Sequence, residues 1–356
     1  MKIVCAPSDH PILREPGTQC RVAIYSRDGA HADVTAGAAL LEEARQRLHS
    51  DARAWDLLSI ALAVTAADKF AIRDRSPDGW TREFDLTIAV ADPAFWRSCA
   101  NLLATQLQFL STDRWTLQFV ENGTRPPEPR RVSPAPENAV ILLSGGMDSF
   151  IGALDTDGHR LLAVSQVSHG DGARQRQFAG LVGGGLRHLQ LNHNARPSPE
   201  LSDRTRSFIF LTYGVLAASS LDTYRAGNVV PLFVCENGFI SLNPPLTASR
   251  FGSLSTRTTH PEFLRSFGSL LSAAGLRIEL RTPYRFATKG EMLVNCAEQE
   301  LLRKFARTTT SCGRFGHYGM RHCGRCVPCL IRRAAFLRRG GGDRSYRVRL
   351  SESGSA

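Results

Sequence analysis

Residues 139–305 alternate short, mostly apolar runs with longer amphipathic stretches, and this alternation restricts the fold more than any other feature of the sequence. Short apolar runs are typical of strands that are buried on both faces, with a helix between each pair of strands. The predicted strands are residues 139–143, 161–167, 188–191, 229–235 and 277–280. The predicted helices begin at Asp148 and cover residues 173–181, 205–224, 261–274 and 289–305. Strands and helices in alternation form a parallel sheet with helices on both faces, so we predict an α/β fold with a doubly wound parallel sheet.

The residues before this region predict a different organisation. Residues 122–138 contain five prolines and no periodic apolar pattern, which is typical of a linker. Residues 1–121 precede it and are predicted to form an N-terminal α+β domain, in which a partner could dock. Its predicted strands are residues 20–25, 84–91 and 115–120, and its predicted helices are residues 37–48 and 93–110. The domain prediction is completed by residues 139–336 as a second domain and residues 337–356 as a basic flexible tail.

The positive charge of the chain is concentrated at one end. The 356 residues include 44 Lys and Arg against 33 Asp and Glu, which gives a net charge of +11. Thirteen of the basic residues and two of the acidic ones lie in residues 303–356, so the other 302 residues are neutral overall. A basic segment of this kind can bind nucleic acid or phosphate-bearing ligands. We prefer a solvated tail from residue 338 onward and keep nucleic-acid binding as the alternative.

The apolar residues give no sign of a membrane protein. No apolar run reaches the ~18–20 residues that a membrane-spanning helix requires. Residues 1–10 lack the long apolar segment of a secretory signal. We therefore expect a cytoplasmic protein without membrane association.

The first predicted strand of the second domain leads directly into a glycine turn that reads Ser144-Gly145-Gly146-Met147-Asp148-Ser149. Ligands of open α/β sheets bind beyond the carboxyl ends of the strands, where backbone amides and a helix N-terminus can meet an anion. Two adjacent glycines allow the backbone to turn tightly around a phosphate, and the two serines add hydroxyl groups. We predict that all six residues bind ATP, and that Asp148 also holds Mg²⁺ against the phosphate oxygens. The turn lacks the Lys-Ser/Thr ending of a Walker A loop and resembles the pyrophosphatase loop of the adenine-nucleotide α-hydrolase superfamily, whose members cleave ATP to AMP and pyrophosphate.

Four of the nine cysteines lie close together, at Cys312, Cys323, Cys326 and Cys329. Two overlapping Cys-x-x-Cys turns offer three thiolates from one tight knuckle, and the fourth cysteine closes the set from across a glycine-containing loop. Four cysteine ligands leave no open coordination position, so we predict a structural Zn²⁺ site at residues 312–329. A redox-active Cys-x-x-Cys is the less favoured alternative. The other five cysteines are scattered singly and are expected to be buried core residues.

The residues around this quartet closely resemble the C-terminal zinc signature of the QueC family, which are 7-cyano-7-deazaguanine synthases of the PP-loop ATP pyrophosphatase superfamily. The similar segment is residues 323–336, Cys-Gly-Arg-Cys-Val-Pro-Cys-Leu-Ile-Arg-Arg-Ala-Ala-Phe. Residues 282–291 are similar to the Thr-Pro…Lys-x-Glu segment of the family, with Lys289 as its lysine. Residues 206–212 resemble its Arg-Asn-x-x-Phe-Leu-Ser helix start, with Ser207 in place of Asn. The resemblance covers about residues 139–336.

This resemblance implies an ATP-dependent C–N ligase of the 7-cyano-7-deazaguanine synthase type. The family adenylates the carboxylate of 7-carboxy-7-deazaguanine, lets ammonia displace AMP to give an amide, and makes the nitrile after a second activation by ATP. Asp148, Lys289 and Arg206 are the catalytic residues that the resemblance implies. Lys289 could neutralise negative charge that builds up on the phosphates.

Two departures from the family put the acceptor in question. A long polar loop replaces the substrate segment of the family, and a loop of this length in a compact domain is usually functional. From it we take the substrate-binding candidates Glu236, Asn237, Arg250, Arg257, Thr258 and His260. The second departure is the N-terminal extension, which is similar to that of longer QueC-like proteins from anti-phage defence operons of the Qat and CBASS types. There the activated deazaguanine could pass to an amine of a partner protein encoded in the same operon instead of ammonia.

Two other functions stay open at this point. A tRNA-thiolating relative would use the same loop with a persulfide-carrying cysteine, for which Cys235 is the candidate. A non-catalytic zinc-knuckle protein would bind nucleic acid through the basic segment and would not turn over ATP. The sequence also leaves the oligomeric state open, with a homodimer among the arrangements that we consider.

Overall fold

The structure is a computed structural model that describes residues 1–27, 29, 31–130, 134–156, 158–167, 170–246, 257–343 and 345–347. The chain divides into two compact units that are each built from several segments. Unit 1 consists of residues 1–140, 191–232 and 254–280, and unit 2 of residues 141–190, 233–253 and 281–356. Among the described residues, none of the helices combines the length and the apolar character that crossing a membrane requires.

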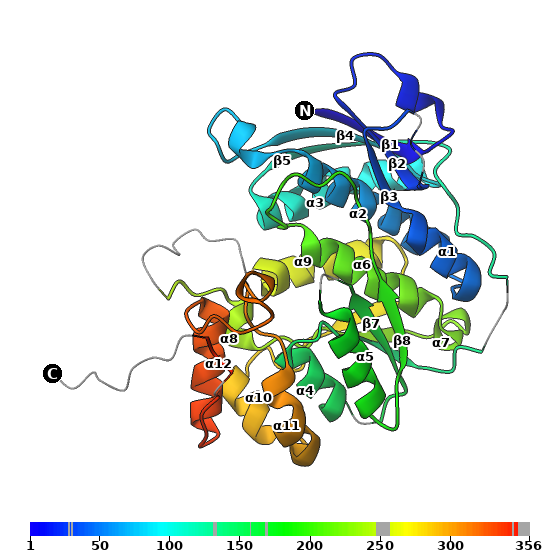
Figure 1. Ribbon diagram of the computed structural model, residues 1–356. Helices are drawn as coiled ribbons and strands as arrows, with labels where there is room; N and C mark the ends of the chain where they lie inside the picture. Colours follow the sequence, from blue (N-terminus) through cyan, green and yellow to red (C-terminus); the bar gives the residue numbers. More distant parts are fainter. Residues whose placement is uncertain are drawn as a thin grey trace. The chain divides into compact units, whose positions relative to one another are not determined.

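The N-terminal part of unit 1 contains a five-stranded sheet in the order β3-β2-β1-β4-β5 (Figure 1). Its strands are β1 (Lys2–Pro7), β2 (Cys20–Ser26), β3 (Val34–Gly37), β4 (Glu83–Ala89) and β5 (Arg114–Val120). Every neighbouring pair in this sheet is parallel. Parallel strands need crossover connections, which are usually α-helices, and here helices connect β3 to β4 and β4 to β5. This part is therefore α/β, and the predicted α+β arrangement of the N-terminal part is wrong.

One helix between β3 and β4, α2 (Ala52–Phe70), was not predicted from the sequence. Residues 54–68 of this helix are buried without a break. A helix that is buried on all sides has no polar face, so its sequence lacks the amphipathic periodicity by which a helix is found. Asp51 begins the helix, because its side chain accepts a hydrogen bond from the Arg53 backbone amide at 2.8 Å.

The remaining helices of unit 1 pack around α2 and the sheet. They are α1 (Ala38–Arg47), α3 (Pro93–Ser111), α6 (Arg206–Ser219), α7 (Asp222–Arg225) and α9 (Pro261–Ala273). Within this unit α2 packs against α6, and α3 packs against α9. The proline-rich segment is bound to the same unit, since the Ala135 amide donates to the Asp222 carboxylate at 2.9 Å and the Arg130 amide donates to the Arg45 carbonyl at 2.7 Å.

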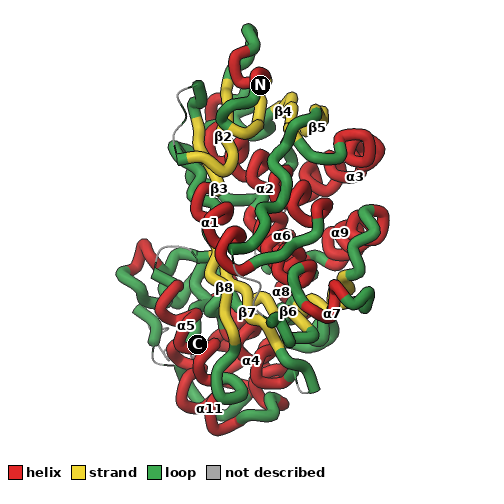
Figure 2. Tube along the Cα trace, turned by 90° about the vertical axis from the view of Figure 1, so that its right-hand side faces the viewer, coloured by secondary structure: helices red, strands yellow, loops and turns green. Residues whose placement is uncertain are grey.

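The second sheet repeats the strand order of the first. Its order is β10-β9-β6-β7-β8, and Figure 2 shows β6, β7 and β8 as neighbouring strands. The strands are β6 (Ala139–Leu142), β7 (Leu161–Gln166), β8 (Arg187–Leu191), β9 (Val230–Phe233) and β10 (Ile278–Arg281). All five lie at predicted positions and the sheet is parallel, which confirms the α/β prediction. The strand order reverses at β6, and an open α/β sheet binds its ligands beside such a point.

The helices of unit 2 include four that differ from the predicted ones. They are α4 (Met147–Asp155), α5 (Gly172–Leu181), α8 (Gly238–Ser241), α10 (Lys289–Asn295), α11 (Gln299–Phe305) and α12 (Val327–Arg338). The predicted helix at residues 289–305 is divided into α10 and α11, because Cys296 adopts an extended ψ of 132°. The helices α8 and α12 were not predicted, and α12 packs against α10.

Short 3-10 turns complete the described elements. They cover Pro11–Arg14, Arg73–Arg75, Arg257–Thr259, Ala306–Thr308 and Gly316–Tyr318.

Candidate functional site

The glycine turn connects the central strand β6 to helix α4. Gly145 has a φ of 83°, a left-handed conformation that favours glycine. The turn is held by its own serines, since the Ser144 amide donates to the Ser149 hydroxyl at 3.2 Å and that hydroxyl donates to the Gly146 carbonyl at 3.2 Å. Gly146 precedes the first residue of α4 and offers no side-chain cap to the helix. The N-terminal amides of α4 therefore lack a side-chain cap, which is the usual arrangement where a helix N-terminus meets an anion.

Asp148 lies at the start of α4 in a buried polar cluster. One of its carboxylate oxygens, Oδ1, accepts from the Lys289 ammonium group, and both side chains are almost fully buried. The other oxygen, Oδ2, accepts from the Asn237 side-chain amide at 2.7 Å and from the Asn237 backbone amide at 3.2 Å. The half-buried Glu236 also forms a hydrogen bond to Asp148. The cluster thus joins the segments that follow β6, β9 and β10.

The two carboxyl groups of the cluster have opposite protonation preferences. Burial opposes ionisation of Asp148, but the Lys289 charge and the hydrogen bonds from Glu236, Lys289 and Asn237 outweigh it and lower its pKa to about 2. Burial and the negative charge of Asp148 raise the pKa of Glu236 well above its usual range. Asp148 is therefore ionised at neutral pH, while burial and the Asp148 charge favour the protonated form of Glu236, which can donate in the hydrogen bond to Asp148.

This arrangement does not offer Asp148 to a magnesium ion. Magnesium prefers carboxylate oxygens that are free to coordinate it. Both oxygens of Asp148 instead accept hydrogen bonds from Lys289 and Asn237. The residues around Asp148 thus do not fit a magnesium site in this conformation.

Thr310 supports the glycine turn from a distant part of the sequence. Its backbone amide donates to the Gly145 carbonyl at 3.0 Å, and it pairs with Gly146 as an isolated parallel bridge. The Arg174 guanidinium donates to the Thr310 hydroxyl. Gln175 lies beside the first residue of the turn. Its side-chain amide donates to the Gln166 backbone carbonyl at 3.1 Å and lies 3.4 Å from the Ser144 backbone carbonyl.

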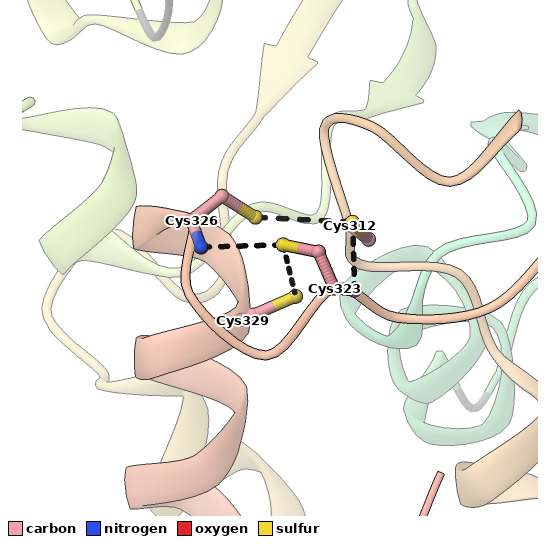
Figure 3. Close-up of side chains that lie close together, drawn as sticks. All are labelled: Cys312, Cys323, Cys326 and Cys329. Carbon is pink, nitrogen blue, oxygen red and sulfur yellow. Dashed lines mark hydrogen bonds between the residues drawn. The ribbon is translucent and has the colours of Figure 1, made fainter. Parts of the chain in front are cut away.

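The four clustered cysteines come together at the N-terminal end of α12 (Figure 3). Their sulfur atoms all lie within 4.8 Å of one another, and the Cys323–Cys329 and Cys312–Cys326 pairs are 3.9 Å apart. A zinc ion with four sulfur ligands at about 2.3 Å has sulfur–sulfur edges of about 3.8 Å in a tetrahedron. The spacing of the predicted zinc-ligand set is therefore compatible with zinc binding.

Backbone amides point at these sulfurs and favour the thiolate form. The Cys326 amide donates to the Cys323 sulfur at 3.3 Å, and the Cys323 amide donates to the Cys312 sulfur at 3.4 Å. The hydrogen bond from Cys329 lowers the pKa of the Cys326 thiol to about 5. The same hydrogen bond raises the pKa of Cys329. A metal ion binds thiolates, so this set of N–H donors suits a metal site.

Other predicted site residues lie in unit 1. Arg206 is exposed at the first position of α6. Arg257 donates to the Phe109 carbonyl at 3.1 Å and lies over the Phe109 ring, while Thr258 is half-buried in the same 3-10 turn. His260 caps helix α9 by accepting from the Glu262 amide at 3.2 Å.

Arg250 lies outside the described residues. Of the substrate-binding candidates, the structure brings Glu236 and Asn237 to Asp148, and Arg257, Thr258 and His260 are bound within the other unit.

Three residues near the glycine turn were missed by the sequence analysis: Arg174, Gln175 and Thr310. Thr310 gave no local signal, because its role depends on a pairing across 164 residues from Gly146. Arg174 and Gln175 had a weak signal, because they follow a predicted strand at its carboxyl end, where ligand-binding residues gather.

Comparison with protein families gives a match to the QueC model, described as queuosine biosynthesis protein QueC, over residues 258–340. The matched segment is less than a quarter of the chain, and it contains Lys289 and the four clustered cysteines. The glycine turn lies outside it. The match supports QueC-like family membership and, with it, an ATP-dependent enzyme of the PP-loop type. A search of curated proteins finds none that matches the chain.

Proposed function

We propose that this chain is an ATP-dependent ligase that adenylates a 7-deazaguanine carboxylate and releases pyrophosphate. The observation that carries the proposal is the buried ion pair between Asp148 and Lys289. It joins the glycine turn, which the family match does not cover, to the lysine inside the matched segment. A turn of the pyrophosphatase type and a QueC-like segment are thus parts of one cluster.

The glycine turn offers hydrogen-bond donors for the phosphates of a nucleoside triphosphate. The left-handed conformation of Gly145 allows the tight turn into α4, and the N-terminal amides of α4 have no side-chain cap. These amides would donate to phosphate oxygens, as helix N-termini do for anions. The Lys289 ammonium uses one N–H for Asp148, and its other N–H groups would donate to phosphate oxygens beside these amides, which stabilises the negative charge on the departing pyrophosphate.

The chemistry proceeds in two transfers. A substrate carboxylate oxygen attacks the α-phosphorus of ATP, the bond to the β-phosphate oxygen breaks, and pyrophosphate leaves. The product is a mixed anhydride of the carboxylate and AMP. An amine nitrogen then attacks the carbonyl carbon, gives up a proton, and AMP leaves with the electrons of the broken C–O bond. The anhydride is needed because a free carboxylate is a poor electrophile.

The acceptor in the second transfer is ammonia or an amine of a partner protein, and we propose a role in anti-phage defence for the second case. The resemblance of the long N-terminal extension to defence-associated proteins supports a macromolecular acceptor. A deletion of residues 1–130 does not test this cleanly, because α2 and α3 pack against α6 and α9 in the same unit. The test therefore uses the full chain.

The experiment mixes the full chain with ATP, magnesium, 7-carboxy-7-deazaguanine and ammonia, and follows pyrophosphate and the products by mass spectrometry. We expect pyrophosphate and a product that carries nitrogen at the former carboxyl group. Lys289→Ala should abolish both, whereas Lys304→Ala is the matched control, because Lys304 is exposed and pairs with Glu300 at 3.0 Å. A wild-type protein that binds and consumes no ATP contradicts the proposal and favours the non-catalytic zinc protein.

The structure favours the ligase over a tRNA-thiolating enzyme. Many tRNA-thiolating enzymes need a reactive, persulfide-carrying cysteine near the nucleotide, and Cys235 is the candidate in this chain. Cys235 is buried, and its burial together with the charge of Asp148 raises the pKa of its thiol. A buried thiol with a raised pKa is a poor nucleophile.

A further inference from the structure

One short segment of unit 2 connects the glycine turn to the cysteine cluster. It runs from Ala306 to Cys312 and contains Thr310, whose amide donates to the Gly145 carbonyl at 3.0 Å. The contact is close, because a Cβ atom on Gly146 would lie 3.3 Å from the Thr310 carbonyl oxygen. At its other end the segment reaches Cys312, one of the four cysteines. The shape of the turn therefore depends on how this segment is held.

Arg332 holds the segment from helix α12. This arginine is fully buried, and its guanidinium donates to five acceptors within residues 306–311. The acceptors are the carbonyls of Ala306, Arg307 and Thr309 and the hydroxyls of Thr309 and Ser311, at distances from 2.8 to 3.2 Å. The remaining nitrogen, Nε, donates to the buried Asp343 carboxylate at 2.7 Å, which balances the charge. Every N–H direction of the guanidinium fork is thus used.

The cysteine knuckle holds the same segment from the other side. The Ser311 amide donates to the His322 ring nitrogen at 3.2 Å, and His322 precedes Cys323 in the chain. The other ring nitrogen of His322 lies 3.1 Å from the Ser345 hydroxyl, which orients the ring. Thr309, Thr310 and Ser311 are therefore fixed between α12, the knuckle and the glycine turn.

We propose that Arg332 is a positioning residue for the glycine turn: by fixing residues 306–311 it holds Thr310 against Gly145 and Gly146 in the shape that binds nucleotide phosphates. The inference rests on the proposed function and extends it to a residue that touches neither substrate nor turn. Only arginine offers five donors in a planar fork, and a lysine could satisfy no more than three of the five segment acceptors. A buried ion pair adds little net stability, because desolvation of both groups offsets their attraction. The positioning role of this arginine therefore rests on its geometry, not on a net gain in stability from the ion pair.

The same contacts couple the cysteine cluster to nucleotide binding. Metal held by Cys312 and Cys323 would fix the knuckle end of the segment, and a nucleotide on the turn would fix the other end. Because such coupling is reciprocal for binding equilibria, a bound nucleotide should raise the affinity of the cluster for zinc in competition with a chelator.

The test compares Arg332→Gln with Arg338→Gln, which removes the same charge from an exposed position at the end of the same helix. Three quantities are measured on the zinc-loaded full chain: zinc content, hydrogen exchange in residues 143–149, and the Kd of a non-hydrolysable ATP analogue. For Arg332→Gln we expect zinc to be retained, faster exchange in the turn, and a Kd raised about 10-fold, within the usual range of coupling between sites. Arg338→Gln should match the wild type in all three.

Two further variants separate positioning from stability. Asp343→Asn removes the charge partner but leaves the contacts of Arg332 with residues 306–311, so it should lower the unfolding temperature with little change in Kd. Thr309→Val removes one acceptor without a change of volume, and it is the variant to use if Arg332→Gln does not fold. It should raise the Kd in the same direction by a smaller factor.

The outcomes distinguish this inference from the proposed function. A folded, zinc-loaded Arg332→Gln with wild-type exchange and wild-type Kd overturns the positioning role. A wild-type chain that binds no nucleotide contradicts the proposed function instead. In that case the exchange of residues 143–149 in Arg332→Gln against Arg338→Gln still decides whether the arginine shapes the turn.

Discussion

The two sheets of this protein have the same strand order, yet the carboxyl ends of their central strands are used differently. In each sheet the first strand lies in the centre, between the second strand and the fourth. In the first sheet β1 leads into residues 8–10 and a short 3-10 turn, in which His10 caps the backbone. In the second sheet β6 leads into a glycine turn and a helix that has no side-chain cap. The order of strands therefore does not decide where a ligand can bind.

The fourth strands of the two sheets show the same contrast. The segment after β4 is closed by Asp56, which accepts from the Ala91 amide at 2.8 Å, the Asp92 amide at 3.0 Å and the Trp96 indole at 2.9 Å. After β9 the carboxylate of Asp148 accepts from Asn237, but its further partner is the charged Lys289. The Asp56 carboxylate has only neutral donors among these partners and stabilises the segment after β4. The Asp148 carboxylate is paired with a cation, Lys289, to which the proposed function gives a role in catalysis.

The largest effect is expected when a cysteine of the clustered quartet is replaced, in comparison with a single buried cysteine of the first sheet. Cys329→Ser should lose zinc and unfold much of unit 2, because structural zinc contributes on the order of 10 kcal/mol to the folding of small zinc peptides. Cys5, which is buried in β1, is the control, and Cys5→Ala should keep zinc at a cost of about 1 kcal/mol. Metal analysis and thermal unfolding measure both effects. Zinc-free wild-type protein would show that the quartet is not a metal site.

A smaller effect is expected at the two carboxylates. Asp148→Asn should slow pyrophosphate release by about 100-fold, because it removes the negative charge that holds Lys289 in place. Asp56→Asn should leave the rate per folded molecule unchanged while it lowers stability, since it disturbs only neutral donors. Rates are measured below the unfolding temperature of both variants. Equal rates of pyrophosphate release in the two variants would show that the Asp148 carboxylate has no functional role that the Asp56 carboxylate lacks.

The pH dependence of stability should also separate the two carboxylates. The pKa of Asp148 falls from 3.8 to about 2 on folding, so its contribution to stability is present above pH 3.8 and is lost as the pH falls towards 2. Burial raises the pKa of Asp56, so its contribution is present below pH 3.8 and is lost as the pH rises through its folded pKa. Free energies of unfolding of both Asn variants, measured against pH, should diverge from the wild type in opposite directions. Parallel curves would contradict the assigned charge states.

The smallest effect is expected at two glycines with left-handed backbones, one beside each sheet. Gly145 has a φ of 83° and Gly37 a φ of 80°. Gly145→Ala should cost about 1–2 kcal/mol of stability, because a Cβ atom is strained in this conformation. Gly37→Ala should cost more, because its Cβ atom would also lie 2.7 Å from the buried Leu62 side chain. Only Gly145→Ala should also weaken the binding of a non-hydrolysable ATP analogue. A similar loss of binding in Gly37→Ala would show that the effect is not local to the turn.

Local sequence patterns predicted much of the second sheet and of the cysteine site. Apolar runs separated by helices gave all five of its strands, because burial on both faces leaves a continuous apolar signal. The four cysteines were found from spacing, because a metal knuckle is built mostly from neighbours in the chain. The first sheet was predicted less well. β1 carries the same continuous apolar signal but was overlooked. The fully buried α2 lacks the contrast between polar and apolar faces that marks an amphipathic helix.

The glycine turn, the zinc-ligand set and the alternation of strands and helices could be predicted from the chain, because each of them depends on residues close together in it. The contact of Lys289 with Asp148 across 141 residues, the support of the turn by Thr310 and the hold of Arg332 on Thr309 and Ser311 became visible in the folded structure alone. Such contacts form between segments whose sequences give no sign of each other. They arise because folding brings the ends of β6, β9 and β10 together, where buried charges and backbone groups must find partners or be left unpaired in a low-dielectric interior.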